Sequence, residues 1–255
     1  MGAEPPMSNL SLAFAHGRYL VVENLRIPIA VLSTAAFPAL TLVFFVVPFA
    51  QTADPEAAAT AIAQLAVFAV MCGYLFNFGI GAADDRERPW DPYLRTLPAP
   101  AWPRIAGRVL NGLVFAAMGV LPLLVIGGLA TSATATPLQL LLGLVALAVA
   151  GLPFLFGGLA IGYSMSVKAA NAATQIVVFP VAFGGGLLLP PWLVPEWLRD
   201  VSIALPSRGA RDLVVWAAVG PAPDVTGLLV LAAWTVLTFG LAVWAFRRDE
   251  GRRFR

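Results

Sequence analysis

The chain has 255 residues, of which 59% are hydrophobic and only 12% are charged, whereas about a quarter of the residues in a soluble domain are charged. So few charges cannot cover a water-exposed surface, which argues against a soluble globular protein. The net charge is only +2, and with Cys72 and His16 as the single cysteine and histidine, an intramolecular disulfide and a Cys/His zinc cluster are excluded.

Residues 9–26 mix leucine, phenylalanine and valine with Arg18 and His16. This composition predicts an interfacial helix along the inner face of a membrane. His16 should be a surface residue there, because no carboxylate or cysteine cluster accompanies it in the sequence. The first residues also lack a basic stretch followed at once by an apolar run, so we expect no cleavable signal peptide.

Six apolar runs follow, and none contains Asp, Glu, Lys, Arg or His. They are residues 27–50, 61–83, 109–130, 137–162, 169–189 and 225–246. A bilayer core of about 30 Å requires roughly 20 helical residues, so each run is long enough to span it. The sequence therefore predicts an all-α membrane protein with six transmembrane helices in a single domain, residues 1–255.

The basic residues predict the orientation, because cytoplasmic loops carry an excess of Lys and Arg. With both termini cytoplasmic, thirteen of the sixteen basic residues lie inside. The outer segments then hold only Arg199, Arg208 and Arg211. The reverse orientation would violate this rule.

The inner segment 84–108 is long and charged. Asp91 and Pro92 suit the N-cap and the first position of a short helix, which should end near Leu97. This helix would expose Tyr93 and Leu94 at the cytoplasmic surface as a docking site. The alternative is a solvated loop whose arginines only determine the topology.

Between the last two spans, residues 190–223 contain apolar pieces that are too short to cross a bilayer. We predict two short helices, at 195–205 and 207–219, that dip into the outer leaflet. Trp192 and Trp197 suit the membrane interface. The glycine run at 184–186 predicts a break in the fifth span.

Motifs for nucleotide binding or hydrolytic catalysis are absent from the sequence. The apolar runs also lack the ionisable group that proton- or ion-coupled carriers keep within the membrane. Energy for transport should therefore enter through the inner segment 84–108. Polar residues in or near the spans could line a pathway or join helices by hydrogen bonds. These are Gln64, Asn77, Asn171, Thr174 and Gln175.

Together these features resemble the permease subunit of the ABC type-2 exporter family. The segment RERPWDPYLRTLPAP, residues 86–100, is similar to the family's coupling helix, which seats in a groove of the partner ATPase. The resemblance implies that five residues face the ATPase: Glu87, Arg88, Tyr93, Leu94 and Arg95. Pro89 stands where the family commonly has glycine.

Residues 179–214 are similar to the outer helical hairpin that caps the family's pathway, although Leu205 replaces the usual asparagine. The resemblance assigns this gate to Gly186, Pro190, Trp192, Pro195, Trp197, Pro206 and Arg211. Residues 9–26 correspond to the family's N-terminal elbow helix.

The resemblance implies an export permease without a catalytic site, in the cell membrane of a prokaryote. It would pair with a second permease half, identical or related, and with two ATPase subunits that bind ATP and Mg²⁺. The chain itself should bind no cofactor, metal or nucleic acid. The cargo would be an amphiphilic or apolar drug, lipid or glycoconjugate. The alternative is an ATP-independent facilitator or a membrane-embedded lipid-modifying enzyme.

Overall fold

The computed structural model describes residues 8–50, 54–90, 93, 102–188, 195–220 and 222–252. All regular elements in these ranges are helical, which confirms the all-α part of the predicted fold class. Within these ranges, five helices are long and apolar enough to cross a membrane. They are Pro55–Glu87, Trp102–Ala130, Pro137–Ser164, Val167–Gly184 and Val225–Glu250.

The first predicted span, residues 27–50, coincides with two helices. Helix α2 (Pro28–Phe45) begins with a proline at its first turn, and Val46 separates it from the short α3 (Val47–Ala50). The apolar stretch Ala36–Phe45 is shorter than a membrane span requires. The sixth crossing therefore stays a prediction.

The most buried of the five spans is a continuous helical segment in three parts. It consists of α4 (Pro55–Tyr74), the π-helix η1 (Leu75–Ile80) and α5 (Gly81–Glu87). Of its most apolar stretch, 67% is buried inside the protein, compared with 22% for the C-terminal span. The helix continues past the predicted end at residue 83 and includes the first charged residues of the inner segment.

The π-helix packs closely against α8 (Pro137–Ser164). At Gly162, a Cβ atom would lie 2.6 Å from the Cβ of Ala82 and 2.6 Å from the carbonyl oxygen of Phe78. The backbones of α8 and the π-helix therefore lie so close together that only glycine fits at this position, as is common between membrane helices. Phe78, on the π-helix, is completely buried.

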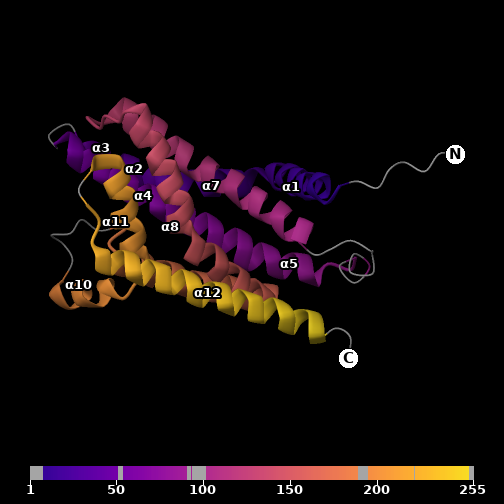
Figure 1. The fold of residues 1–255 in the computed structure, drawn as a ribbon. Coiled ribbons are helices and arrows are strands. Elements are labelled where there is room, and N and C mark those ends of the chain that lie inside the picture. Colours follow the sequence, from indigo (N-terminus) through magenta and orange to yellow (C-terminus); the bar gives the residue numbers. More distant parts are fainter. Residues whose placement is uncertain are drawn as a thin grey trace.

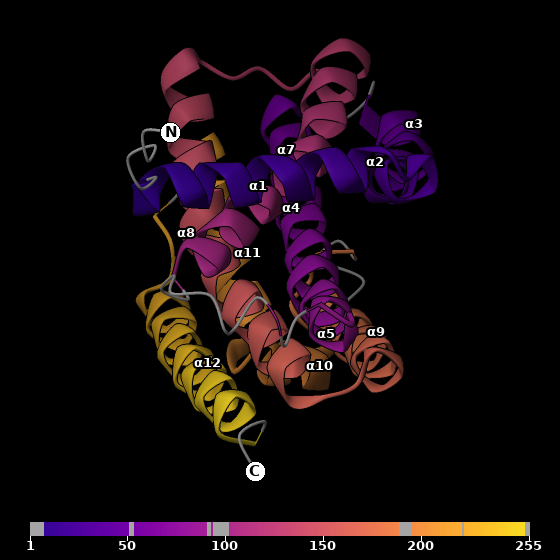
Figure 2. The ribbon, with the colours of Figure 1, turned by 90° about the vertical axis from the view of Figure 1, so that its right-hand side faces the viewer.

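Helix α1 (Asn9–Leu25) lies across one end of the bundle and against α7 (Trp102–Ala130), as Figure 2 shows. The side chain of Ser8 caps α1 by accepting a hydrogen bond from the Ser11 amide. In Figure 1, α1 and the ends of α5 and α12 (Val225–Arg252) lie towards one end of the molecule, and α3 and α10 lie towards the other.

Helix α9 (Val167–Gly184) ends where the glycine run predicted a break, and Gly186 has a positive φ of 69°. Helices α10 (Glu196–Ile203) and α11 (Pro206–Val219) occupy the positions predicted for the two short helices. Ser207 Oγ donates to the carbonyl of Val181 (2.7 Å) at the end of α9. Trp234 of α12 donates to the carbonyl of Ala204 (2.8 Å), so the hairpin is attached to both neighbouring helices.

We predict that Gly162→Val destabilises the protein by about 1–3 kcal/mol, because the side chain would collide with the backbone of the π-helix. Gly143→Val is the matched control, since Gly143 is on the same helix and a Cβ atom there would have no neighbouring atom within 4 Å. Thermal unfolding in detergent measures both. Equal losses of stability would contradict the close approach.

Candidate functional site

The cavity of interest has a volume of about 640 Å³ and is lined by residues of α1, α2, the central helical segment, α7 and α9. Its two parts differ in chemistry. Aromatic side chains line one part: Phe37, Phe68, Phe76, Phe115 and Phe179. The other part is lined by charged residues and amides: Glu23, Asn24, Asn77, Asp84, Asp85, Arg88, Arg108 and Asn111.

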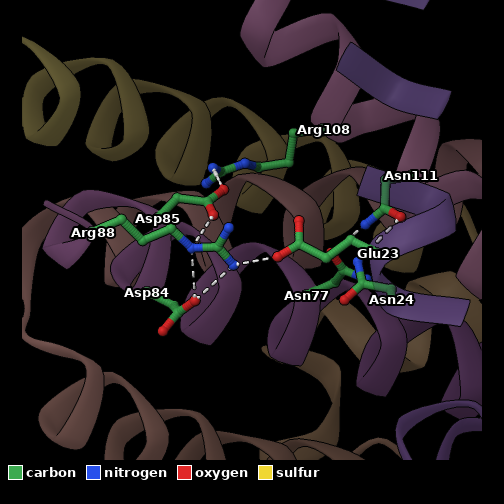
Figure 3. A network of polar contacts seen from close by, with 8 residues as sticks. All are labelled: Glu23, Asn24, Asn77, Asp84, Asp85, Arg88, Arg108 and Asn111. Carbon is green, nitrogen blue, oxygen red and sulfur yellow. Dashed lines mark hydrogen bonds and ion pairs between the residues drawn. The ribbon is translucent and has the colours of Figure 1, made fainter. Parts of the chain in front are cut away.

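Arg88, just after α5, is the centre of the charged part (Figure 3). Its guanidinium lies 2.8 Å from a Glu23 oxygen, 3.1 Å from Asp84 and 3.3 Å from Asp85. Asp85 also forms an ion pair with Arg108 of α7. Burial works against the charged guanidinium, but Glu23, Asp85 and Asp84 outweigh it and raise the pKa of Arg88. This network joins α1, α5 and α7.

A chain of amides lies next to the charged network (Figure 3). Asn24 of α1 donates to Asn111 of α7 over 3.3 Å, and Asn111 donates to Asn77 of the π-helix over 3.0 Å. Asn111 is only 2% exposed, so both of its hydrogen bonds are shielded from solvent. The amides thus join α1, α7 and the π-helix at a second place, next to the charged network.

The arrangement suits binding rather than catalysis. The lining holds three carboxylates and two guanidiniums, and each guanidinium is already paired with a carboxylate. Groups of three or more His, Cys, Asp or Glu that could hold a metal are absent from the described part of the chain. A molecule with a polar head and an apolar body would match both parts of the lining.

The structure separates the polar residues that the sequence proposed for a pathway. Asn77 lines the cavity. Thr174 is buried beside Gly79, where its hydroxyl has no hydrogen-bond partner among the described residues. Gln175 donates to Asn171 (3.0 Å) on the exposed side of α9, and Gln64 is half-buried on α4.

The residues assigned to the ATPase contact lie in different surroundings. Glu87 accepts a hydrogen bond from the amide of Val167 (3.0 Å), and Arg88 is held in the charged network. Tyr93 is 65% exposed. Leu94 and Arg95 lie outside the described residues.

The residues assigned to the outer gate lie around α10 and α11. Gly186 approaches Arg211, whose guanidinium binds Asp212 over 2.8 Å. Trp197 is exposed, and Pro206 is buried where it begins α11. Pro195 directly precedes α10, whereas Pro190 and Trp192 lie outside the described residues.

Sequence reasoning missed most of the polar lining. Asn111 carried a usable signal, because it is an amide within the apolar run 109–130. Glu23, Asn24 and Arg108 carried none, since only the packing of α1 on α7 brings them to the cavity. His16 is half-buried beside Gly107 rather than fully at the surface, and burial and then Arg104 lower its pKa.

A family model described as ABC-2 type transporter matches residues 17–219, which include every residue that lines the cavity. The chain belongs to the ABC-2 type transporter family. It is also similar to the protein named "Putative transport permease YvfS" from Bacillus subtilis (strain 168). The two are 24% identical over 191 residues, which make up 73% of this chain and 76% of the relative.

Membership of the ABC-2 family, together with the five apolar helices, makes the chain a membrane-spanning subunit of a transporter rather than an enzyme. Permeases of the ABC-2 family generally work with ABC ATPases.

We predict that Asn111→Ala lowers the stability of the permease by about 1–3 kcal/mol, because it leaves the half-buried amides of Asn24 and Asn77 without their partner. Asn171→Ala is the control, since this amide is exposed and its described hydrogen bond is to Gln175 alone. Thermal unfolding in detergent compares the variants. The amide chain would have no structural importance if the two midpoints fell together.

Proposed function

We propose that this permease is the transmembrane subunit of an ATP-driven exporter of an amphiphilic substrate, such as a drug, lipid or glycoconjugate. The observation that carries the proposal is the cavity of about 640 Å³, with its aromatic part and its charged part, in a chain of the ABC-2 family. Small-molecule sites commonly have volumes of about 300–1,000 Å³ and a few polar groups that orient the ligand.

An amphiphile matches the cavity better than a wholly apolar cargo. The phenylalanine rings offer contacts for an apolar body. The free oxygens of Glu23 and Asp84 and the amides offer hydrogen bonds for a head group, since each carboxylate is about half exposed. A wholly apolar cargo would leave these polar groups without ligand contacts and would have to displace their water.

Energy for export is proposed to come from a separate ATPase, with ATP and Mg²⁺ bound by two copies of that partner. We place the docking surface on Tyr93, Leu94 and Arg95, because Tyr93 is 65% exposed and the other two follow it directly in the chain. The positive charges of Arg95 and of the neighbouring arginines follow the positive-inside rule for a cytoplasmic segment.

The positive-inside rule also gives the proposed orientation of the whole chain in the membrane. Both termini are cytoplasmic, α1 lies along the inner leaflet as an elbow helix, and α10 and α11 cap the outer end of the pathway. A second permease half, identical or related, completes the membrane part in the cell membrane. The opposite positions of α1 and α10 in Figure 1 support this arrangement.

The partner is tested by purifying the permease from its native membrane and identifying any co-purified ABC ATPase by mass spectrometry. Arg95→Glu should abolish co-purification, because it reverses a charge on the proposed docking surface. Arg199→Glu makes the same change on α10, at the proposed outer end, and should retain the ATPase. Retention by both variants contradicts the docking surface. Failure of the unaltered permease to bind any ATPase supports an ATP-independent facilitator or a lipid enzyme.

The cargo is tested with a phospholipid that carries a short fluorescent acyl chain, in inside-out vesicles supplied with ATP. Phe179→Ala should slow its transport about fivefold, since one aromatic contact contributes about 1 kcal/mol. Phe183→Ala is the control, because Phe183 is on the same helix but does not line the cavity. Equal rates for the two variants would exclude the cavity as the binding site for this probe.

A further inference from the structure

Arg86, near the end of α5, binds two other helices at one point. Its guanidinium lies 2.6 Å from the carboxylate of Asp249 on α12. It also donates to the carbonyl oxygens of Gly162 (2.6 Å) and Met165 (3.0 Å), at the C-terminal end of α8. The side chains of Arg86 and Asp249 are only 17% and 5% exposed. The ion pair is therefore largely protected from screening by solvent.

The next residue, Glu87, binds the helix that follows. Its carboxylate accepts a hydrogen bond from the amide of Val167, the first residue of α9. A helix carries partial positive charge at its N-terminus and partial negative charge at its C-terminus. Arg86 and Glu87 thus place each charge at the helix end of opposite polarity, on the two sides of the turn between α8 and α9.

These contacts add to packing that already holds α12 along α8 and α9 against the π-helix and α5. Helix α8 is already fixed to the central helical segment by the close approach of Gly162 to Phe78. Glu87 and the Arg86–Asp249 pair add polar contacts from α5 to the inner ends of α9 and α12. An aromatic contact between Tyr163 of α8 and Phe246 of α12 (5.1 Å between ring centroids) lies beside the ion pair.

The attachment lies immediately before the segment that we propose to contact the ATPase. Because this segment directly follows α5, its displacement would reach Glu87 and Arg86 along the backbone, as it would reach α7 through Trp102. Arg86 can pass it on to α8 and α12 at once, because its planar guanidinium holds several donors in a fixed geometry. Lysine would carry the same charge without that geometry.

We propose that Arg86, together with Asp249 and Glu87, is the positioning element that transfers movement of the inner segment to α9 and α12. This inference rests on the proposed ATP-driven function and adds the route of coupling within the chain. Asp249 lies beyond residues 17–219, the part that matches the family model.

The test uses the complete permease–ATPase complex in lipid nanodiscs, with Cys72 replaced by alanine because it is the only cysteine. Spin labels are attached through cysteines at Leu121 on α7 and Val236 on α12, both largely exposed. Their distance is measured by electron paramagnetic resonance, without nucleotide and after trapping with ATP and vanadate. Hydrolysis of ATP is measured in parallel.

In the labelled parent protein, trapping should change the distance between the two labels. Asp249→Asn should reduce that change to less than half while ATP hydrolysis continues, because the ATPase then works without moving α12. Asp200→Asn makes the same change at an exposed position on α10 and should behave like the parent protein. A full distance change in Asp249→Asn overturns the inference.

Arg86→Lys provides a second measurement if Asp249→Asn does not assemble. It keeps the charge and should still reduce the distance change, whereas an unchanged response overturns the inference. If the parent protein binds the ATPase and moves but the variants move equally, only this inference fails. If the parent protein shows neither ATPase binding nor an ATP-dependent distance change, the proposed function fails and the inference fails with it.

Discussion

The π-helical turn Leu75–Ile80 determines which neighbours the charged end of the central helix meets. A residue inserted into an α-helix turns every later side chain by about 100° around the axis, because each residue advances by that angle. This turn places Asn77 against Asn111 and directs Asp84, Asp85 and Arg88 towards α1 and α7. Arg86 then faces α8 and α12. The cavity and the attachment of α12 both depend on this one irregularity.

The π-helical turn is held in place because the backbone of α8 packs directly against its backbone at Gly162. Gly162 admits the carbonyl of Phe78 where any side chain would exclude it. In a membrane, helices gain little from the hydrophobic effect when they associate, so close packing and polar contacts must hold them together. The polar contacts of α5 with α1, α7, α8, α9 and α12 gather at one end of the bundle. Replacing a buried ion pair by apolar residues often leaves stability unchanged, but removing one partner costs about 3–5 kcal/mol. The buried pair of Arg86 and Asp249 therefore fixes the relative positions of α5 and α12 more than it adds to the free energy of folding.

Sequence reasoning predicted the helical class, the positions of five apolar helices, the break at Gly184 and the two short helices before α12, because each depends on local composition. It did not predict the π-helix, which follows from packing against α8 and has no local signal in Leu75–Ile80. It also did not indicate that Glu87, one of the residues assigned to the ATPase contact, accepts a hydrogen bond from the first amide of α9. Such a contact joins residues eighty positions apart, and no spacing in the sequence could indicate it. The cavity was missed for the same reason, since its polar lining combines α1, α5 and α7.

The cavity network and the attachment of α12 share a single stretch of five residues. Asp84, Asp85 and Arg88 face the cavity, while Arg86 and Glu87 bind α8, α9 and α12. Because consecutive residues of one helical turn cannot move independently, a displacement that reaches this stretch changes both sides together. A carrier requires this property, since release of cargo must accompany the movement of the helices around it. On the proposed function, the ATPase would not need separate contacts for the cavity and for the bundle. A push on the segment after Arg88 would rearrange the head-group end of the cavity and the inner ends of α9 and α12 in the same step.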